Sequence, residues 1–135
     1  MFSPLYYFGN RSQLFDDLLN LMQVAQSQRK EQKKWRCCYD LFAGSGSMTI
    51  AAMAHNLAER YIINDVYPPL ALFWQAVKDN PTTLQKTYAR LLDTYLLYDE
   101  EGAREEFYQT QLSKFNQAGN TLNADYAALF AFLIN

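Results

Sequence analysis

Residues 39–50 read YDLFAGSGSMTI, and the expected fold follows from this stretch. It places small residues between an apolar run, 35–42, and a segment, 47–57, whose apolar residues recur at helical spacing. The first run is too short for a typical helix and is rich in Cys and aromatic residues, so we expect a buried strand. The second segment predicts a helix that begins at the glycine loop.

A second short apolar run, RYIIN at residues 60–64, predicts another buried strand and completes a β-α-β unit, which forms parallel sheets. Two parallel strands leave both sheet edges and much of both faces to be covered. We therefore expect a helix-rich α/β fold with an incomplete parallel sheet. One more helical pattern lies before the unit, at residues 12–26. Four lie after it, beginning at Pro68, beginning at Pro81, at about 101–115 and at 123–134.

Length and composition limit the possible classes of protein. A chain of 135 residues, half of them hydrophobic and 16% aromatic, fits one folded domain, and this composition argues against intrinsic disorder. Twelve basic against fourteen acidic residues give a net charge of -2, so any contact with nucleic acid has to be local. The basic run at residues 29–36 fits either a solvated linker or a patch that contacts phosphate.

Metal centres and membrane spans are not expected. Cys37 and Cys38 are adjacent, so a disulfide between them would be strained, and we expect two buried thiols. A single His and no spaced Cys pair argue against a zinc site. The amino terminus lacks a secretory signal pattern and no apolar run has the length of a membrane span, so we expect a cytoplasmic protein.

The glycine loop is suited to hold a ligand, because small residues allow close approach and the following helix start presents unpaired amides. The loop lacks the third glycine of the dinucleotide fingerprint and the Lys of a phosphate-binding P-loop. Asp65, directly after the second predicted strand, is placed to accept hydrogen bonds from two ribose hydroxyls. Ribose without pyrophosphate indicates S-adenosyl-L-methionine, and a tight turn without a ligand is the alternative.

Two runs, YDLFAGSGSMTIAA and YIINDVYPPLALFWQAVKDNP, resemble the DNA adenine-specific methyltransferase family that includes the bacterial Dam enzyme. In that family an acidic-x-Phe-x-Gly-x-Gly loop precedes an Asn-Asp or Ala-Asp step. The opening YYFGNRSQL resembles the family's amino-terminal segment more loosely, and EEFYQTQLSKFN with DYAALFAFLIN resembles its helical stretch before the target-recognition elements. The resemblance spans nearly the whole chain and implies a partial Rossmann-like, S-adenosylmethionine-dependent methyltransferase fold.

The resemblance also implies roles for parts of the chain. Residues 1–80 would bind the cofactor, and residues 81–135 would form a helical segment leading toward a target-recognition region. Asp65 would hold the ribose and Val66 would pack against adenine. For Tyr7 and Phe8 the alternative is a role as ordinary core residues, and for Arg11 it is a surface charge without a ligand. The implied cofactor-binding residues are Tyr7, Phe8, Gly9, Arg11, Asp40, Phe42, Ala43, Gly44, Ser45, Gly46, Ser47, Asp65 and Val66.

The family's catalytic motif is missing from these residues. Adenine methyltransferases of this type use an Asp-Pro-Pro-Tyr motif to accept hydrogen bonds from the adenine amino group and to stack the flipped base. The only Pro-Pro here is Pro68-Pro69, and Asp65 before it is already assigned to ribose. We therefore expect no catalytic residue in this chain.

The chain ends within an apolar helical pattern, AALFAFLIN, before the point where family members continue. We expect the cofactor-binding half of a DNA adenine methyltransferase, present as a truncated product or as a subunit that acts on DNA with a second polypeptide. One alternative is an inactive remnant that self-associates through its open sheet edge. The other is a non-catalytic nucleoside-binding or interaction module.

Overall fold

The computed structural model describes residues 5, 15–29, 34–118 and 123–135. The chain divides after Val66 into two compact units, Met1–Val66 (unit 1) and Tyr67–Asn135 (unit 2), and each is described by itself. The functional division after residue 80 stays a prediction. The helices and the two strands follow in the order α1 (Phe15–Ser27), β1 (Cys38–Asp40), α2 (Ser47–Ala54), β2 (Tyr61–Ile63), α3 (Pro68–Asp79), α4 (Pro81–Leu96), α5 (Glu101–Gln117) and α6 (Ala124–Ile134).

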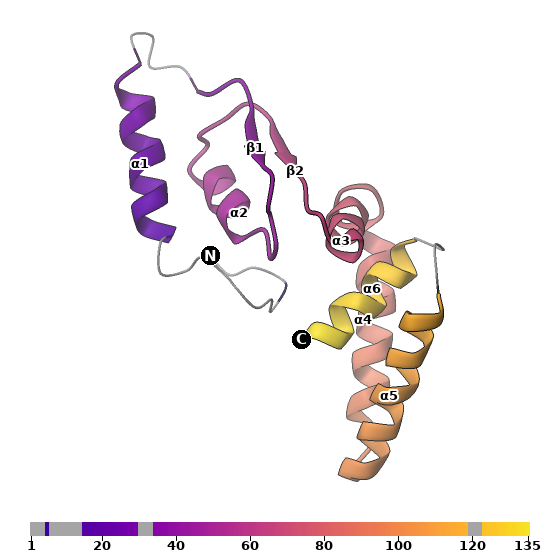
Figure 1. Ribbon diagram of the computed structural model, residues 1–135. Helices are drawn as coiled ribbons and strands as arrows, with labels where there is room; N and C mark the ends of the chain where they lie inside the picture. The colour runs from indigo at the N-terminus through magenta and orange to yellow at the C-terminus, as the bar shows by residue number, and fades with distance from the viewer. Residues whose placement is uncertain (1–4, 6–14, 30–33, 119–122) are drawn as a thin grey trace. The chain divides into compact units, whose positions relative to one another are not determined.

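Unit 1 contains the predicted β-α-β arrangement (Figure 1). Strands β1 and β2 pair in parallel, with Cys38 opposite Tyr61 and Asp40 opposite Ile63. Both strands are shorter than the apolar runs that predict them. In β1, Leu41 and the residue after it already belong to the turn. The prediction of a helix-rich chain with a small parallel sheet is therefore confirmed.

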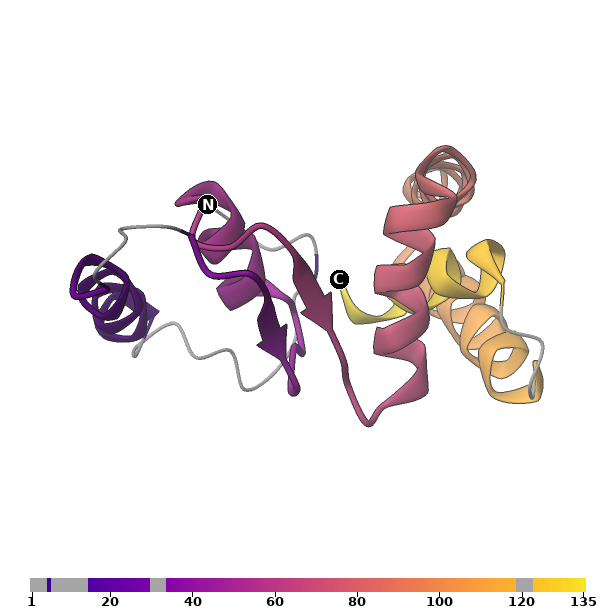
Figure 2. The ribbon, with the colours of Figure 1, turned by 90° about the horizontal axis from the view of Figure 1, so that it is seen from above.

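The core of unit 1 lies on the side of the sheet that α2 covers. Figures 1 and 2 show α2 between α1 and the two strands. Leu19 of α1, Ala52 of α2 and Leu57 beyond α2 form a buried cluster. Four partly buried hydrophobic residues pack against this cluster, namely Met22, Trp35, Met48 and Tyr61.

The tyrosine at the start of β2 ties the strand to the end of α2. The Tyr61 hydroxyl donates a hydrogen bond to the Ala52 carbonyl at 2.9 Å and accepts one from the Ala58 N–H at 2.8 Å. Helix α2 ends at Ala54 rather than at the predicted Leu57, because Asn56 adopts a left-handed conformation with φ 56°. The chain then turns directly into the bridge between Ala58 and Trp35 that precedes the sheet.

The prediction of buried strands is wrong for unit 1. The side chains of Tyr39 and Ile62, at the middle of each strand, are 61% and 38% exposed. Successive residues of a strand point to opposite faces, so a helix on one face covers only the alternate residues. The apolar composition of these runs therefore predicts the strands correctly but does not show that both faces of the sheet are covered.

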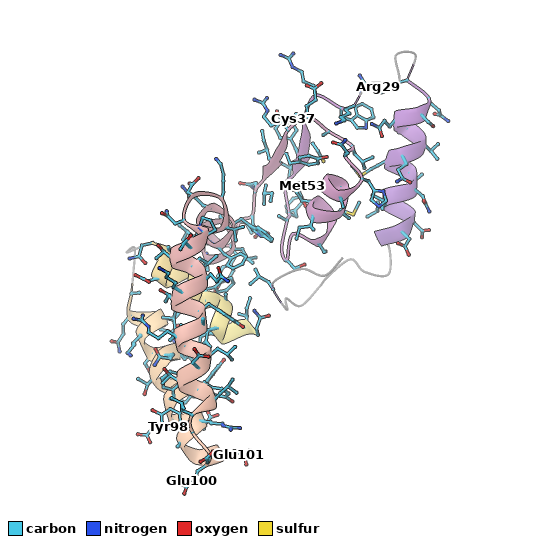
Figure 3. All side chains as sticks on the ribbon, turned by 180° about the vertical axis from the view of Figure 1, so that it is seen from behind. Arg29, Cys37, Met53, Tyr98, Glu100 and Glu101 are labelled. Atoms are coloured by element: carbon cyan, nitrogen blue, oxygen red, sulfur yellow. The ribbon has the colours of Figure 1, made fainter. Side chains whose placement is uncertain are left out.

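The two cysteines are free thiols, as expected, but they are half-buried rather than buried. Cys37 is labelled in Figure 3 just before β1, and Cys38 is the first residue of that strand. Burial raises the pKa of the Cys38 thiol, and the negative charge of Asp40 and the neighbouring Cys37 raise it further. Cys38 is therefore kept in its protonated, weakly nucleophilic form near neutral pH.

Unit 2 is helical where the structure describes it, and α3 to α6 begin where the sequence predicts. A proline occupies the first turn of α3 and of α4, where its missing N–H costs no hydrogen bond. Asn123 caps α6 by accepting a hydrogen bond from the Tyr126 N–H at 2.9 Å. Helix α6 packs against α3, α4 and α5 and buries Ala127, Ala128, Phe130, Ala131 and Phe132.

Three consecutive acidic residues of unit 2, Asp99, Glu100 and Glu101, lie at the turn between α4 and α5. Figure 3 labels Tyr98, Glu100 and Glu101 at this turn, and both glutamates are exposed. Negative charge in the first turn of α5 is favourable next to the positive end of the helix dipole. Within the residues that the structure describes, no group of three His, Cys, Asp or Glu side chains is arranged to hold a metal ion.

Candidate cofactor site

The loop between β1 and α2 is shaped by two glycines. Gly44 has φ 52° and Gly46 has φ 70°, a left-handed conformation that glycine adopts without the steric cost of a Cβ atom. The Gly46 N–H donates to the Ala43 carbonyl at 2.7 Å, which closes the turn. Gly46 is also the N-cap residue of α2, so it brings no side chain to the amides of the first turn.

Asp65 lies against this loop. Its Oδ2 accepts a hydrogen bond from the Gly44 N–H at 2.9 Å. Two backbone hydrogen bonds also keep the residues before Asp65 next to the loop. The Asn64 N–H donates to the Asp40 carbonyl at 2.8 Å, and the Ala43 N–H donates to the Asn64 carbonyl at 3.1 Å. The structure thus brings together the glycine loop and the carboxylate, which were selected from sequence on separate grounds.

Asp40, the last residue of β1, supplies a second carboxylate beside the loop. Its Oδ2 accepts a hydrogen bond from the Thr49 hydroxyl at 2.7 Å. Thr49 is 2% exposed and lies on α2, nine residues after Asp40. Thr49 has no sequence signal of its own, because a threonine does not belong to the apolar stripe that predicts α2.

The other loop residues selected from sequence differ in their surroundings. Ala43 and Ser45 are buried, whereas Phe42 is exposed. The Ser45 hydroxyl contacts the Ser47 hydroxyl at 3.4 Å, a long hydrogen bond. Small buried residues thus form the inner part of the loop, while the aromatic ring lies at its surface.

The remaining predicted site residues lie on either side of the loop in sequence. Val66 follows Asp65 and is exposed. Tyr7, Phe8, Gly9 and Arg11 lie outside the residues that the structure describes. Their assignment to a cofactor pocket therefore stays a prediction.

The chemistry of the described groups follows from their charge. Ionised carboxylates such as those of Asp40 and Asp65 only accept hydrogen bonds, so they suit hydroxyl groups and cationic groups of a ligand. The backbone amides at the start of α2 donate, and the helix dipole adds partial positive charge there. One end of the sheet therefore offers acceptors and donors within one loop.

The family of the chain is shown by comparison with known proteins. The model of the D12 class N6 adenine-specific DNA methyltransferase family matches residues 7–134, nearly the whole chain. The chain belongs to this family. The resemblance to Dam-like adenine methyltransferases is thereby confirmed. No curated protein and no solved structure matches the chain.

This member of the D12 class family carries the loop and its two flanking carboxylates inside the matched range. Membership makes it a DNA adenine methyltransferase-like protein and relates it to proteins that use S-adenosylmethionine in general. None of the helices that the structure describes combines the length and apolar character needed to cross a bilayer.

Proposed function

We propose that this D12 class chain binds S-adenosyl-L-methionine at its glycine loop and serves as the cofactor-binding part of a DNA adenine methyltransferase. The hydrogen bond between the Gly44 N–H and Asp65 Oδ2 carries the proposal, because it joins the loop to the carboxylate. Both groups follow the carboxyl ends of parallel strands, where open α/β sheets bind their ligands. We further propose that β1 and β2 are part of a larger Rossmann-like sheet.

Each group of the site has a proposed contact with the cofactor. A carboxylate has about four lone-pair positions, so Asp65 can hold the Gly44 amide and accept from ribose hydroxyls as well. Gly44 and Gly46 have no Cβ and allow the backbone to approach the nucleoside. Phe42 and Val66 expose apolar surface that an adenine ring can cover. Tyr7, Phe8, Gly9 and Arg11 complete the proposed pocket on the family resemblance alone.

The catalytic loop is proposed to come from residues other than these. The 135 residues contain no Asp-Pro-Pro-Tyr motif, which holds and stacks the target adenine in this family. Either a second polypeptide or further residues of a longer protein would supply it. In this proposal the present chain contributes cofactor binding, and DNA is the substrate of the completed enzyme.

A methylation assay separates these contributions. The chain alone is expected to transfer no labelled methyl group from S-adenosylmethionine to adenine-containing DNA. Transfer is expected after addition of a polypeptide from a neighbouring reading frame that carries the Asp-Pro-Pro-Tyr motif. Methyl transfer by the chain alone would contradict the proposed division of labour.

Substitution of Asp65 tests the proposed cofactor site. Asp65→Ala is expected to weaken binding of S-adenosylmethionine by about 10- to 100-fold, because hydrogen bonds to a charged group contribute about 1.5–3 kcal/mol. Asp65→Asn keeps an oxygen that can accept from the Gly44 N–H but loses the charge, so we expect intermediate binding. Isothermal titration calorimetry measures the affinities, and circular dichroism checks that each variant folds.

A matched control is available in the same unit. Glu59 is exposed and lies before β2, at the opposite end of the strand from Asp65. Glu59→Ala removes a carboxylate at that end and is expected to leave the affinity unchanged. Equal binding by the Asp65→Ala and Glu59→Ala variants, or a folded wild-type chain that binds no S-adenosylmethionine, would refute the proposed site.

A further inference from the structure

The basic run at residues 29–36 has no part in the proposed cofactor site. Its sequence fits two interpretations, a solvated linker and a patch that contacts phosphate. The structure describes Arg29 and residues 34–36 of this run, and the contacts of these residues favour the second interpretation.

The backbone around Trp35 is fixed to the sheet of unit 1. Trp35 forms a parallel bridge with Ala58 just before the two strands. Its N–H donates to the Leu57 carbonyl at 2.9 Å, and its carbonyl accepts from the Glu59 N–H at 2.8 Å. The indole ring packs on the buried cluster of unit 1. Residues 34–36 therefore extend the sheet, which a solvated linker would not do.

Four exposed basic side chains lie on or next to this fixed segment. Lys34 and Arg36 flank Trp35 in sequence. The Arg29 guanidinium carbon is 4.2 Å from the centre of the Trp35 ring, a cation–π contact that brings the end of α1 to the segment. Arg60, just before β2, accepts through its carbonyl from the N–H of the first residue of β1 at 2.8 Å. We call Arg29, Lys34, Arg36 and Arg60 the basic end of unit 1.

The positive charge of the basic end is not neutralised by its described surroundings. No ion pair joins any of the four side chains to another residue that the structure describes. The Lys34 ammonium donates to the Asn56 side-chain oxygen at 2.7 Å, and this partner has no charge. Glu59 is the one acidic residue in segments 34–36 and 57–60. Exposed cations without carboxylate partners favour a ligand that brings several negative charges.

Nucleic acid is the polyanion that fits these features. Duplex DNA presents one negative charge per roughly 1.7 Å of helix axis, so several neighbouring cations can be engaged at once. The matched family consists of DNA methyltransferases. An anionic membrane surface fits less well, because Trp35 is the one large apolar residue among Arg29 and residues 34–36 and its ring is half-buried.

The basic end and the glycine loop lie at opposite ends of the strands. Residues 34–36 and Arg60 precede the strands, whereas the loop and Asp65 follow them. Figure 1 shows the end of α1 at the same end of unit 1 as the start of β1, and Figure 3 labels Arg29 there. We propose that the basic end binds phosphate groups of the DNA backbone, as a sequence-independent contact separate from the cofactor site.

The salt dependence of DNA binding tests this proposal. Fluorescence anisotropy measures binding of the chain to a labelled duplex without S-adenosylmethionine, so the result does not depend on the proposed cofactor function. Four phosphate contacts predict that log K falls with log salt concentration with a slope of about −3 to −4. The double variant Lys34→Gln with Arg36→Gln is expected to reduce this slope by about 2 and to weaken binding at about 50 mM salt by roughly 10- to 100-fold.

Arg29→Gln provides a second variant that leaves the extension of β1 unchanged. It removes one cation at the end of α1 and is expected to reduce the slope by about 1. Circular dichroism checks that each variant folds. An unchanged slope in both the double variant and Arg29→Gln would overturn the inference.

A matched control removes the same amount of charge from unit 2. Lys78 and Lys114 are both exposed, and Lys78→Gln with Lys114→Gln is expected to keep the slope and to change the affinity by less than about twofold. Equal weakening by the two double variants would overturn the inference, because net charge and not the basic end would then control binding. Wild-type chain that binds no duplex, or that binds vesicles of phosphatidylserine and phosphatidylcholine more tightly than duplex, would overturn it as well.

Discussion

Leu57→Ala is expected to destabilise unit 1 by about 2–5 kcal/mol, the range for removing a buried leucine side chain. Leu57 is 2% exposed and belongs to the buried cluster with Leu19 and Ala52. The substitution leaves a cavity between α1 and α2, where two helices and the sheet meet. A change of this size is a large fraction of the stability of a small unit.

The measurement uses the tryptophan that packs on the cluster. Trp35 reports on unit 1, so urea unfolding is followed by its fluorescence in a Trp74→Phe background, which removes the signal of unit 2. Leu21→Ala is the matched control, because Leu21 lies on α1 and is 65% exposed. The control is expected to shift the free energy of unfolding by less than about 0.5 kcal/mol. Equal shifts for the two variants would contradict the assignment of the core.

Gly46→Val is expected to impair both the fold of the loop and binding of the cofactor. Gly46 has φ 70°, and in this conformation a residue with a Cβ atom is less stable by roughly 1–2 kcal/mol. β-Branched valine is among the least tolerated residues there. The loop would relax away from this shape, and the turn closed by the hydrogen bond to the Ala43 carbonyl would open. We expect binding of S-adenosylmethionine to fall by about tenfold or more.

A second substitution at Gly46 separates the effect of backbone strain from the effect of a side chain that contacts the ligand. Asn tolerates the left-handed conformation, so Gly46→Asn is expected to recover most of the stability lost in Gly46→Val. Its side chain still occupies the space into which the ligand is proposed to come, so binding is expected to remain weak. Thermal unfolding and calorimetric titration of the two variants give both values. Wild-type affinity in Gly46→Asn would show that the ligand does not approach this glycine.

The helices were the most predictable part of the fold. Pro68 and Pro81 mark helix starts because proline is tolerated there and nowhere later in a helix, and α3 and α4 begin at these residues. Strand lengths were less predictable, since Leu41 continues the apolar run but lies in the turn after β1. Composition alone does not separate an apolar residue in a strand from an apolar residue at the surface of a loop.

The candidate site was predictable where its parts are encoded locally. The loop glycines and Asp65 each have a sequence signal, and the structure joins them through the Gly44 amide. Thr49 was missed because its role depends on how the first turn of α2 lies over β1, and a short polar residue on a buried helix face gives no periodic signal. The half-burial of Cys38 was missed for a related reason, since coverage of a strand depends on the elements that pack on it.

The shortness of the two strands has a consequence for how unit 1 responds to a ligand. A strand of three residues spans about 10 Å, so the hydrophobic cluster at one end of the strands and the loop at the other end are separated by only this distance. Few residues lie between the cluster and the loop over which a shift of the backbone could be accommodated. We therefore expect substitutions in the cluster to alter ligand binding at the loop, because the two lie within one strand length of each other.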